Sequence, residues 1–359
     1  MLTSTRGRRG MAVAPHALAS QSALDVLREG GNAIEAMIAA AATIAVVYPH
    51  MNSIGGDSFW LIHNPGKSPG AIDACGAAAG LASIDWYRAH GAGDAIPFRG
   101  GLAANTVAGT VSGWGAAHAL SRRAWGGRMP WSRLLEDAIY YASEGVPVTP
   151  SQAASTAKKT GELKAQPGYA QTFLARGKVP KTGSLFAQKR VAATLKRIAE
   201  AGADDFYRGD LAREIQRDLA RIGSPLVLAD LAEHRARLVD PLRIRHSMGM
   251  LYNMTPPTQG LVSLLILGIL DELKVRRTGP SSPEFVHLCV EAAKQAFSVR
   301  DRYLEDPRYM SVDAQRLLAK SLVRELASKV DRRHAAPWGA AAGKRGKGPG
   351  DTVWMGVVD

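Results

Sequence analysis

The sequence has few of the features that hold small secreted or metal-stabilised proteins together. Its 359 residues include only two cysteines, Cys75 and Cys289, which form no spacing motif. We therefore expect neither a disulfide framework nor a zinc site. Four histidines also lack the spacing of metal ligands: His50, His63, His234 and His246. Metal and cofactor are accordingly both predicted to be absent.

Long apolar runs and targeting segments are missing as well. The longest apolar run, "AMIAAAATIAVVYP", has 14 residues, is rich in alanine and is too short to span a bilayer. The N-terminal segment "MLTSTRGRRGMAVAPHALAS" contains arginines but no apolar core of signal-peptide length. We therefore expect a cytoplasmic protein with no membrane partner, and we interpret the apolar run as a buried helix.

Acidic residues are outnumbered, since 45 Lys and Arg face 32 Asp and Glu and give a formal net charge of +13. Such an excess can indicate nucleic acid, a membrane surface or anionic substrates as partners. The basic residues are scattered, as in "LARGKVPKTG" and "SRRAWGGR", and no aromatic-interleaved basic stripe is present. A solvated basic surface accounts for the charge, and no nucleic-acid partner is expected.

Hydrophobic periodicity and turn residues predict a chain rich in helices. Asn32 should cap the second helix, with Glu35 reaching back to the cap amide. A glycine turn and a short strand are expected in residues 52–63, with 70–75 as a hairpin partner. A β-hairpin is expected at 242–254. The other predicted helices are 16–29, 112–125, 131–144, 189–200, 210–221 with Asp210 as N-cap, 259–273, 282–303 and 312–329.

The end of the chain changes character twice. Residues 332–351 carry five glycines, two prolines and many charges without periodicity, which predicts a flexible basic linker. The apolar run "TVWMGVVD" then begins at Thr352. Taken alone, Thr352 could simply be a β-forming residue at the start of a strand.

Four stretches, in order along the chain, resemble the gamma-glutamyltranspeptidase family. "DVLREGGNAIEAMIAAAATIAVVYPHMNSIGGDSFWLI" is similar to the family's N-terminal signature, and "AANTVAGTVSGW" to its "PGTVAG" segment. "TPPTQG" lies where the family has a proline-rich turn, and "TVWMGVVD" resembles the start of its small subunit. Each stretch alone is a weak signal. Together they cover the chain from about Ala12 to Asp359, which makes the resemblance specific.

The resemblance implies an N-terminal nucleophile hydrolase with an α+β fold, a four-layer αββα sandwich. Here the large-subunit portion with its helical periphery would occupy residues 1–331, the linker 332–351, and the start of a truncated small subunit 352–359. The precursor would cut itself between Asp351 and Thr352, and the two subunits would then form a heterodimer. We expect these 359 residues alone to be inactive. Their last eight should be poorly anchored or lie in an incomplete sheet.

The family's chemistry explains why a threonine would stand at this position. A free hydroxyl is a poor nucleophile at neutral pH and needs a base. The α-amino group released by cleavage has a pKa of roughly 8, so that part of it is neutral near pH 7 and can serve as that base. The β-methyl restricts χ1 and holds the hydroxyl in one direction. Thr352 is thus expected to be a buried catalytic nucleophile that forms an acyl-enzyme.

Departures from the family pattern bear on the substrate. The family's arginine for the substrate α-carboxylate falls at Cys75, within "DACGAAAG", and Val353 replaces a second threonine. A thiol cannot form a bidentate ion pair with a carboxylate. These changes resemble the branch that includes oxamate amidohydrolases, which implies a small amide rather than glutathione as substrate. Cys75 could instead be a small, buried apolar residue without a catalytic part.

The remaining candidate pocket residues are less specific. Gly55, Gly56 and Asp57 form part of a tight turn that the resemblance places near the active site, although Asp57 could equally cap a turn. Arg99, in "PFRGG", is a candidate anion anchor or an ordinary surface arginine.

Three functions are therefore weighed. The first is an autoprocessing threonine amidohydrolase or acyltransferase. The second is a catalytically incomplete relative of such enzymes, and the third is a basic polyanion-binding protein.

Overall fold

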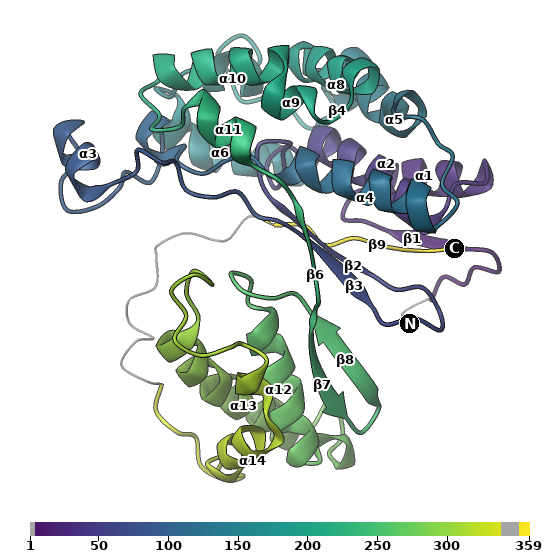
Figure 1. Ribbon diagram of the computed structural model, residues 1–359, viewed down its shortest axis with the longest axis vertical. Helices are drawn as coiled ribbons and strands as arrows, with labels where there is room; N and C mark the ends of the chain where they lie inside the picture. The colour runs from purple at the N-terminus through teal and green to yellow at the C-terminus, as the bar shows by residue number, and fades with distance from the viewer. Residues whose placement is uncertain (1–3, 339–351) are drawn as a thin grey trace. The chain divides into compact units, whose positions relative to one another are not determined.

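The computed structural model describes residues 4–338 and 352–359 (Figure 1). Its contacts divide the chain into two compact units. The first contains the described residues of 1–58, 74–237 and 350–359, and the second contains those of 59–73 and 238–349. Each unit has its own core, and each is described separately below.

The first unit consists mainly of helices. They are α1 (Ala17–Arg28), α2 (Ala33–Val47), α3 (Ile84–Ala89), α4 (Thr110–Ala124), α5 (Trp131–Glu144), α6 (Pro150–Leu163), α7 (Tyr169–Phe173), α8 (Lys189–Ala201), α9 (Asp205–Arg208), α10 (Asp210–Arg221), α11 (Leu228–Glu233) and the 3-10 turn η1 (Gly101–Ala103). Two antiparallel strand pairs accompany them: β1 (Met11–Val13) with β9 (Gly356–Val358), and β4 (Val146–Pro147) with β5 (Leu185–Phe186).

Helix α2 forms the centre of this unit. It packs against α1, α4, α5 and β9, and twelve of its 15 residues are buried (Figure 1). A helix that is apolar on all sides needs neighbours on all sides, which explains the alanine-rich run in its sequence. The predicted cap is confirmed, because the Asn32 side chain accepts from the Ile34 and Glu35 amides while Glu35 accepts from the Asn32 amide.

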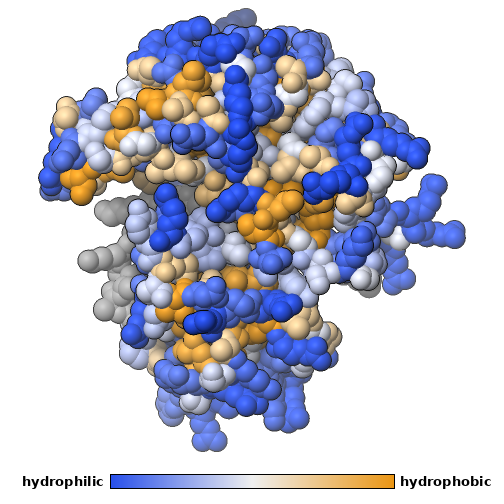
Figure 2. Space-filling model, viewed as in Figure 1, coloured by the Kyte–Doolittle hydropathy of each residue, from blue (hydrophilic) through white to orange (hydrophobic). Residues whose placement is uncertain are grey.

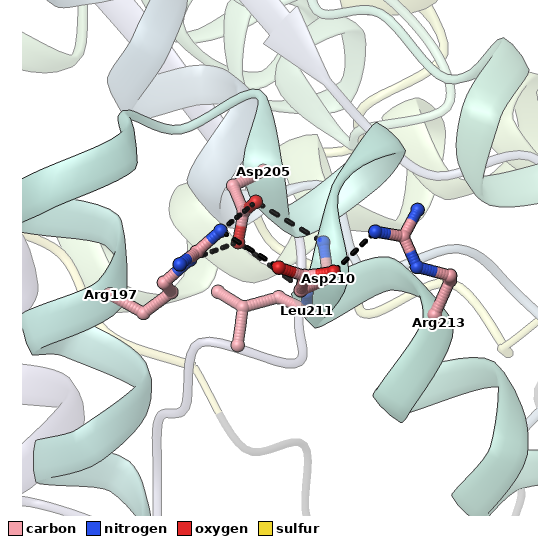
Figure 3. A network of polar contacts seen from close by, with 5 residues as sticks. All are labelled: Arg197, Asp205, Asp210, Leu211 and Arg213. Carbon is pink, nitrogen blue, oxygen red and sulfur yellow. Dashed lines mark hydrogen bonds and ion pairs between the residues drawn. The ribbon is translucent and has the colours of Figure 1, made fainter.

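Asp205, rather than Asp210, caps the start of α10, so the prediction for that helix is wrong in this detail. The Asp205 carboxylate accepts from the amides of Asp210 and Leu211 at 3.2 and 3.4 Å (Figure 3). Asp210 is the first helical residue, and its side chain points outward to Arg197 and Arg213. A hydrogen bond from Arg197 lowers the pKa of the Asp205 carboxyl.

The second unit combines strands with a smaller set of helices. Its three-stranded sheet has the order β2 (Ser58–Ile62), β3 (Gly70–Ala74), β6 (Arg237–Val239), and one residue of each of these strands falls in the first unit. The hairpin β7 (Leu242–His246) and β8 (Gly249–Asn253) is followed by α12 (Gly260–Glu272), η2 (Val275–Arg277), α13 (Pro283–Tyr303), η3 (Arg316–Leu318) and α14 (Lys320–Ser328). Residues of β7, α12, α13 and α14 form its core.

The start of the expected linker, together with Asp331 directly before it, lies along one face of α13. Glu284 binds Arg332, and His287 contacts the Asp331 carbonyl at 2.8 Å. One turn further, Glu291 is 1% exposed and pairs with Lys294 at 2.6 Å. The pair holds the backbone of Ala336 from both sides, since Glu291 accepts from its N–H and Lys294 donates to its carbonyl. We call residues 331–338 the α13 strap.

Helix prediction failed at several places: the short helices α3, α7, α9 and α11 were not predicted, and two longer stretches also differ. Residues 312–319 are not α-helical, because Asp313 caps a turn by accepting from the amides of Gln315 and Arg316, and only the 3-10 turn η3 follows. Helix α6 was not predicted, although Thr149 accepts from the Gln152 amide and Pro150 occupies the first turn, a recognised start signal. The linker prediction for 339–351 lies outside the described residues.

Most charged side chains lie at the surface, as their solvation requires. Figure 2 shows hydrophilic residues over most of the visible face, with hydrophobic residues in separate patches. Among the described residues, the buried carboxylates are Glu35, Asp73, Asp205 and Glu291. None of the helices in the described part combines the length and the apolar character that crossing a bilayer would need.

Candidate active site

The glycine turn of residues 53–57 binds the start of α4. The Gly56 carbonyl accepts from the amides of Gly109 and Thr110 at 2.8 and 2.9 Å. The Thr110 hydroxyl donates to the carbonyl of Asp57 at 2.9 Å. Because α4 has no side-chain cap, the Gly56 carbonyl accepts hydrogen bonds from two amides at its start. The exposed turn Gly55–Asp57 is therefore held in place by the helix start.

The segment after β3, residues 77–79, pairs with residues 105–107 just before α4. The Ala77 carbonyl accepts from the Val107 amide at 3.0 Å, and the Ala79 amide donates to Asn105 at 2.9 Å. A Cβ atom on Gly76 would lie 1.6 Å from the Val107 carbonyl oxygen, so only glycine fits there. Cys75, directly before Gly76, is a half-buried cysteine in its thiol form.

The Tyr207 hydroxyl binds the backbone at the start of α4, and sequence reasoning missed this residue. Its hydroxyl donates to the Ala108 carbonyl at 2.7 Å and accepts from the Ser112 amide at 2.8 Å. The ring is 2% exposed, and burial raises the pKa of the phenol well above its ordinary value. A buried tyrosine needs a partner for its hydroxyl, but the sequence does not indicate which backbone groups will provide it.

Replacing Tyr207 by phenylalanine is expected to destabilise the protein by about 1–3 kcal/mol, because two partly buried backbone groups lose their partner. The measurement is urea unfolding of the complete proenzyme. Tyr140→Phe is the matched control, since Tyr140 is 60% exposed and its loss should cost no more than about 0.5 kcal/mol. Equal stability of the two variants would show that the hydroxyl does not hold the α4 start.

Thr352 does not lie where the sequence placed it. It is exposed, and the strand begins only at Gly356, whereas a buried threonine at the strand start was expected. The reason is the short ladder: β9 pairs with β1 through Gly356, Val357 and Val358, so residues 352–355 have no ladder partner among the described residues. Residues 356–358 are nevertheless anchored in a two-stranded sheet, which agrees with the expectation of an incomplete sheet at the end of the chain. Asp351 lies outside the described residues.

Arg99 is held away from the junction of the turn and the Cys75 segment. Its guanidinium binds Glu162 of α6 at 2.8 Å and lies 4.6 Å from the centre of the Phe98 ring. The hydrogen bond from Arg99 lowers the pKa of the Glu162 carboxyl. The contacts of the described residues thus join Gly55–Asp57 and the segment that follows Cys75 to one stretch, 105–110, and engage Arg99 elsewhere. Within the same residues, no cluster of three His, Cys, Asp or Glu side chains could hold a metal ion.

Comparison with known sequences gives a consistent result. The family model described as gamma-glutamyltranspeptidase matches residues 19–359. An oxamate amidohydrolase proenzyme of Klebsiella pneumoniae is 54% identical over 359 residues, which is 100% of this chain and 66% of the relative. A glutathione hydrolase-like YwrD proenzyme of Bacillus subtilis is 38% identical and covers 92% of this chain and 62% of its own length. The chain therefore spans about two thirds of the length of these relatives.

Solved structures agree with the sequences. Helicobacter pylori gamma-glutamyltranspeptidase superposes with a TM-score of 0.86 at 26% identity and covers 96% of this chain and 99% of that chain. Cephalosporin acylase from Bacillus halodurans gives a TM-score of 0.85 at 30% identity over 100% of this chain and 65% of that chain. The expected N-terminal nucleophile hydrolase fold, mixed from helices and sheets, is confirmed. By sequence and by structure, the chain belongs to the gamma-glutamyltranspeptidase family.

Proposed function

We propose that this chain supplies the large subunit of an autoprocessing threonine amidohydrolase or acyltransferase that acts on a small amide. The observation that carries the proposal is the 54% identity, over all 359 residues, to an oxamate amidohydrolase proenzyme. The geometry adds support, because the segment that starts at Thr352 runs into a strand paired with β1 in the first unit.

The proposal assigns the chain's parts to two subunits. Residues 1–331 form the large-subunit region, 332–351 the linker, and the small subunit begins at Thr352. The names of the relatives, which are proenzymes, support this division. After cleavage the two parts remain together as a heterodimer. The cytoplasmic location stays a prediction.

Self-cleavage creates the base that turnover needs. In the precursor the nitrogen of Thr352 belongs to the amide with Asp351 and cannot accept a proton. The Thr352 hydroxyl attacks the Asp351 carbonyl carbon, the C–N bond breaks, and the nitrogen gains a proton. Water then hydrolyses the resulting ester, which leaves a carboxylate on Asp351 and a free amino group and hydroxyl on Thr352.

Turnover repeats the same acyl transfer on a substrate. The Thr352 amino group accepts the hydroxyl proton as the oxygen attacks the amide carbonyl of the substrate. That proton leaves with the departing amine, and the acyl group remains as an ester on Thr352. Water releases the acid, or a second amine takes the acyl group. Both outcomes return the threonine to its starting state.

The substrate pocket is proposed at the junction of the glycine turn and the Cys75 segment. Gly55, Gly56 and Asp57 are held at the start of α4, and residues 77–79, which follow Cys75 closely, pair with 105–107 beside it. This places several backbone groups and one thiol at a common segment. Arg99 is left out of the pocket, because its guanidinium already pairs with Glu162.

Glutathione is expected to be a poor substrate of the complete enzyme. Cys75 stands where the family's carboxylate-binding arginine falls, and loss of a charge-assisted contact costs about 1.5–3 kcal/mol, or at least roughly tenfold in kcat/KM. Steady-state rates on oxamate and on a gamma-glutamyl anilide measure this preference. A preference for the gamma-glutamyl compound would contradict the assignment.

Cys75→Arg tests the same point by restoring a cation. It should raise kcat/KM for the gamma-glutamyl anilide relative to oxamate. Cys75→Ser is the matched control, since it keeps a small side chain without charge and should leave the ratio unchanged. If arginine and serine variants behave alike, Cys75 does not face the substrate carboxylate.

A further inference from the structure

The start of α2 has four backbone amides that the helix itself cannot satisfy. Three are bound locally: the Asn32 amide by Glu35, and the Ile34 and Glu35 amides by Asn32, each at 3.1 Å. The fourth, the Ala33 amide, donates to the side chain of Asp359 at 2.8 Å. A residue 326 positions away in the sequence thus completes the cap of the central helix of the first unit.

This helix start is itself firmly tied to the core. Glu35 is 1% exposed, and its second oxygen accepts from the Met129 amide at 2.8 Å. The Asn32 amide group donates to the Ser121 hydroxyl at 2.8 Å, near the end of α4. A carboxylate at this position also lies at the positive end of the α2 dipole, which strengthens its contact with the helix start. Because Asp359 binds the Ala33 amide, its side chain is tied to a helix start that is fixed in the core.

Asp359 directly follows β9, whose alignment with β1 is short. Only three residue pairs define the register: Met11 with Val358, Ala12 with Val357, and Val13 with Gly356. A slip of one residue would turn every side chain of the strand to the opposite face. The contact of Asp359 with Ala33 excludes such a slip, because it fixes the end of the strand to the helix.

We propose that Asp359 is a positioning residue for Thr352. Its carboxylate locks the register of β9 on the α2 start, and so fixes the position of the nucleophile seven residues upstream in the same segment. The role rests on the proposed function of Thr352. Loss of the Asp359 carboxylate should therefore slow self-cleavage and the chemical step, although Asp359 itself does not contact the substrate.

The test uses variants of the complete proenzyme. Asp359→Leu should slow self-cleavage and lower kcat by roughly ten- to hundredfold, the cost of a small misplacement of a reacting group, with KM within about twofold of wild type. Asp359→Asn keeps an oxygen acceptor for the Ala33 amide and should retain most of the rate. Gly10→Ala is a second route to the same strand, since its Cβ would lie 2.9 Å from the Val358 carbonyl oxygen. It should also slow self-cleavage.

Asn32→Ala is the matched control. It removes the two hydrogen bonds to the helix amides, and those of the Asn32 amide group to Ser121 and Trp125, without touching β9. It should therefore lower Tm while kcat stays within about twofold of wild type. A fall of kcat in Asn32→Ala equal to that in Asp359→Leu would overturn the proposal, because the effect would then follow helix stability alone. Wild-type self-cleavage in both Asp359→Leu and Gly10→Ala would also overturn it. Cleavage of a Thr352→Ala proenzyme would instead remove the proposed function on which this role rests.

Discussion

Thr352→Ala in the complete proenzyme is expected to leave a single uncut chain without amidase activity. The substitution removes the oxygen that attacks both the Asp351 carbonyl and the substrate. Without cleavage, the nitrogen of residue 352 remains an amide and supplies no base. Loss of a nucleophile and its base together should lower the rate by roughly a thousandfold or more. Denaturing gel electrophoresis and an oxamate hydrolysis assay measure the two effects.

Thr352→Ser separates the hydroxyl from the methyl group. Serine keeps the attacking oxygen but loses the β-branch that restricts χ1, so its proenzyme should be cut more slowly and still become active. If the alanine proenzyme is cut at the bond before residue 352, another group performs the cleavage and Thr352 is not the nucleophile.

Lys294→Met is expected to give the largest loss of stability. It leaves the Glu291 carboxylate, 1% exposed, without its cation in the core of the second unit. Removing one partner of a buried ion pair costs about 3–5 kcal/mol, because the other charge stays buried and unpaired. The α13 strap should loosen as well, because Lys294 also holds the Ala336 carbonyl and lies 5.4 Å from the ring centre of Trp338.

Urea unfolding measures the stability, and trypsin cleavage after Arg332 and Arg333 measures release of the strap. Lys329→Met is the matched control, because Lys329 pairs with Glu325 at the surface, with side chains 53% and 59% exposed. That exposed pair should contribute less than about 1 kcal/mol. Equal stability of the two lysine variants would contradict the account of the buried pair.

Much of the fold follows from local sequence. The Asn32 and Glu35 cap, the proline-led start of α13 and the β7–β8 hairpin are all confirmed, because each depends on residues within a few positions. Local reasoning failed where two nearby carboxylates could cap the same helix start. For α10, Asp205 reaches the free amides from the preceding turn, and the nearer Asp210 turns to the arginines instead. The sequence alone does not decide between two such carboxylates.

The candidate site was predictable only as a set of segments. The glycine turn and Cys75 were named from the family resemblance, but their meeting at residues 105–110 depends on backbone contacts between distant parts of the chain. Tyr207 and Asp359 were missed for the same reason: each binds a backbone group about a hundred or more positions away. The exposure of Thr352 reflects a ladder that reaches only to Gly356.

The intact mass of the protein produced from the complete gene tests the central claim most directly. The account predicts two chains, one ending at Asp351 and the other beginning with Thr352, whose masses sum to that of the precursor plus one water. A parallel preparation of Thr352→Ala should give the precursor mass alone. A fully active wild-type protein that retains the single precursor mass, or that is cut at another bond, would contradict the assignment of Thr352.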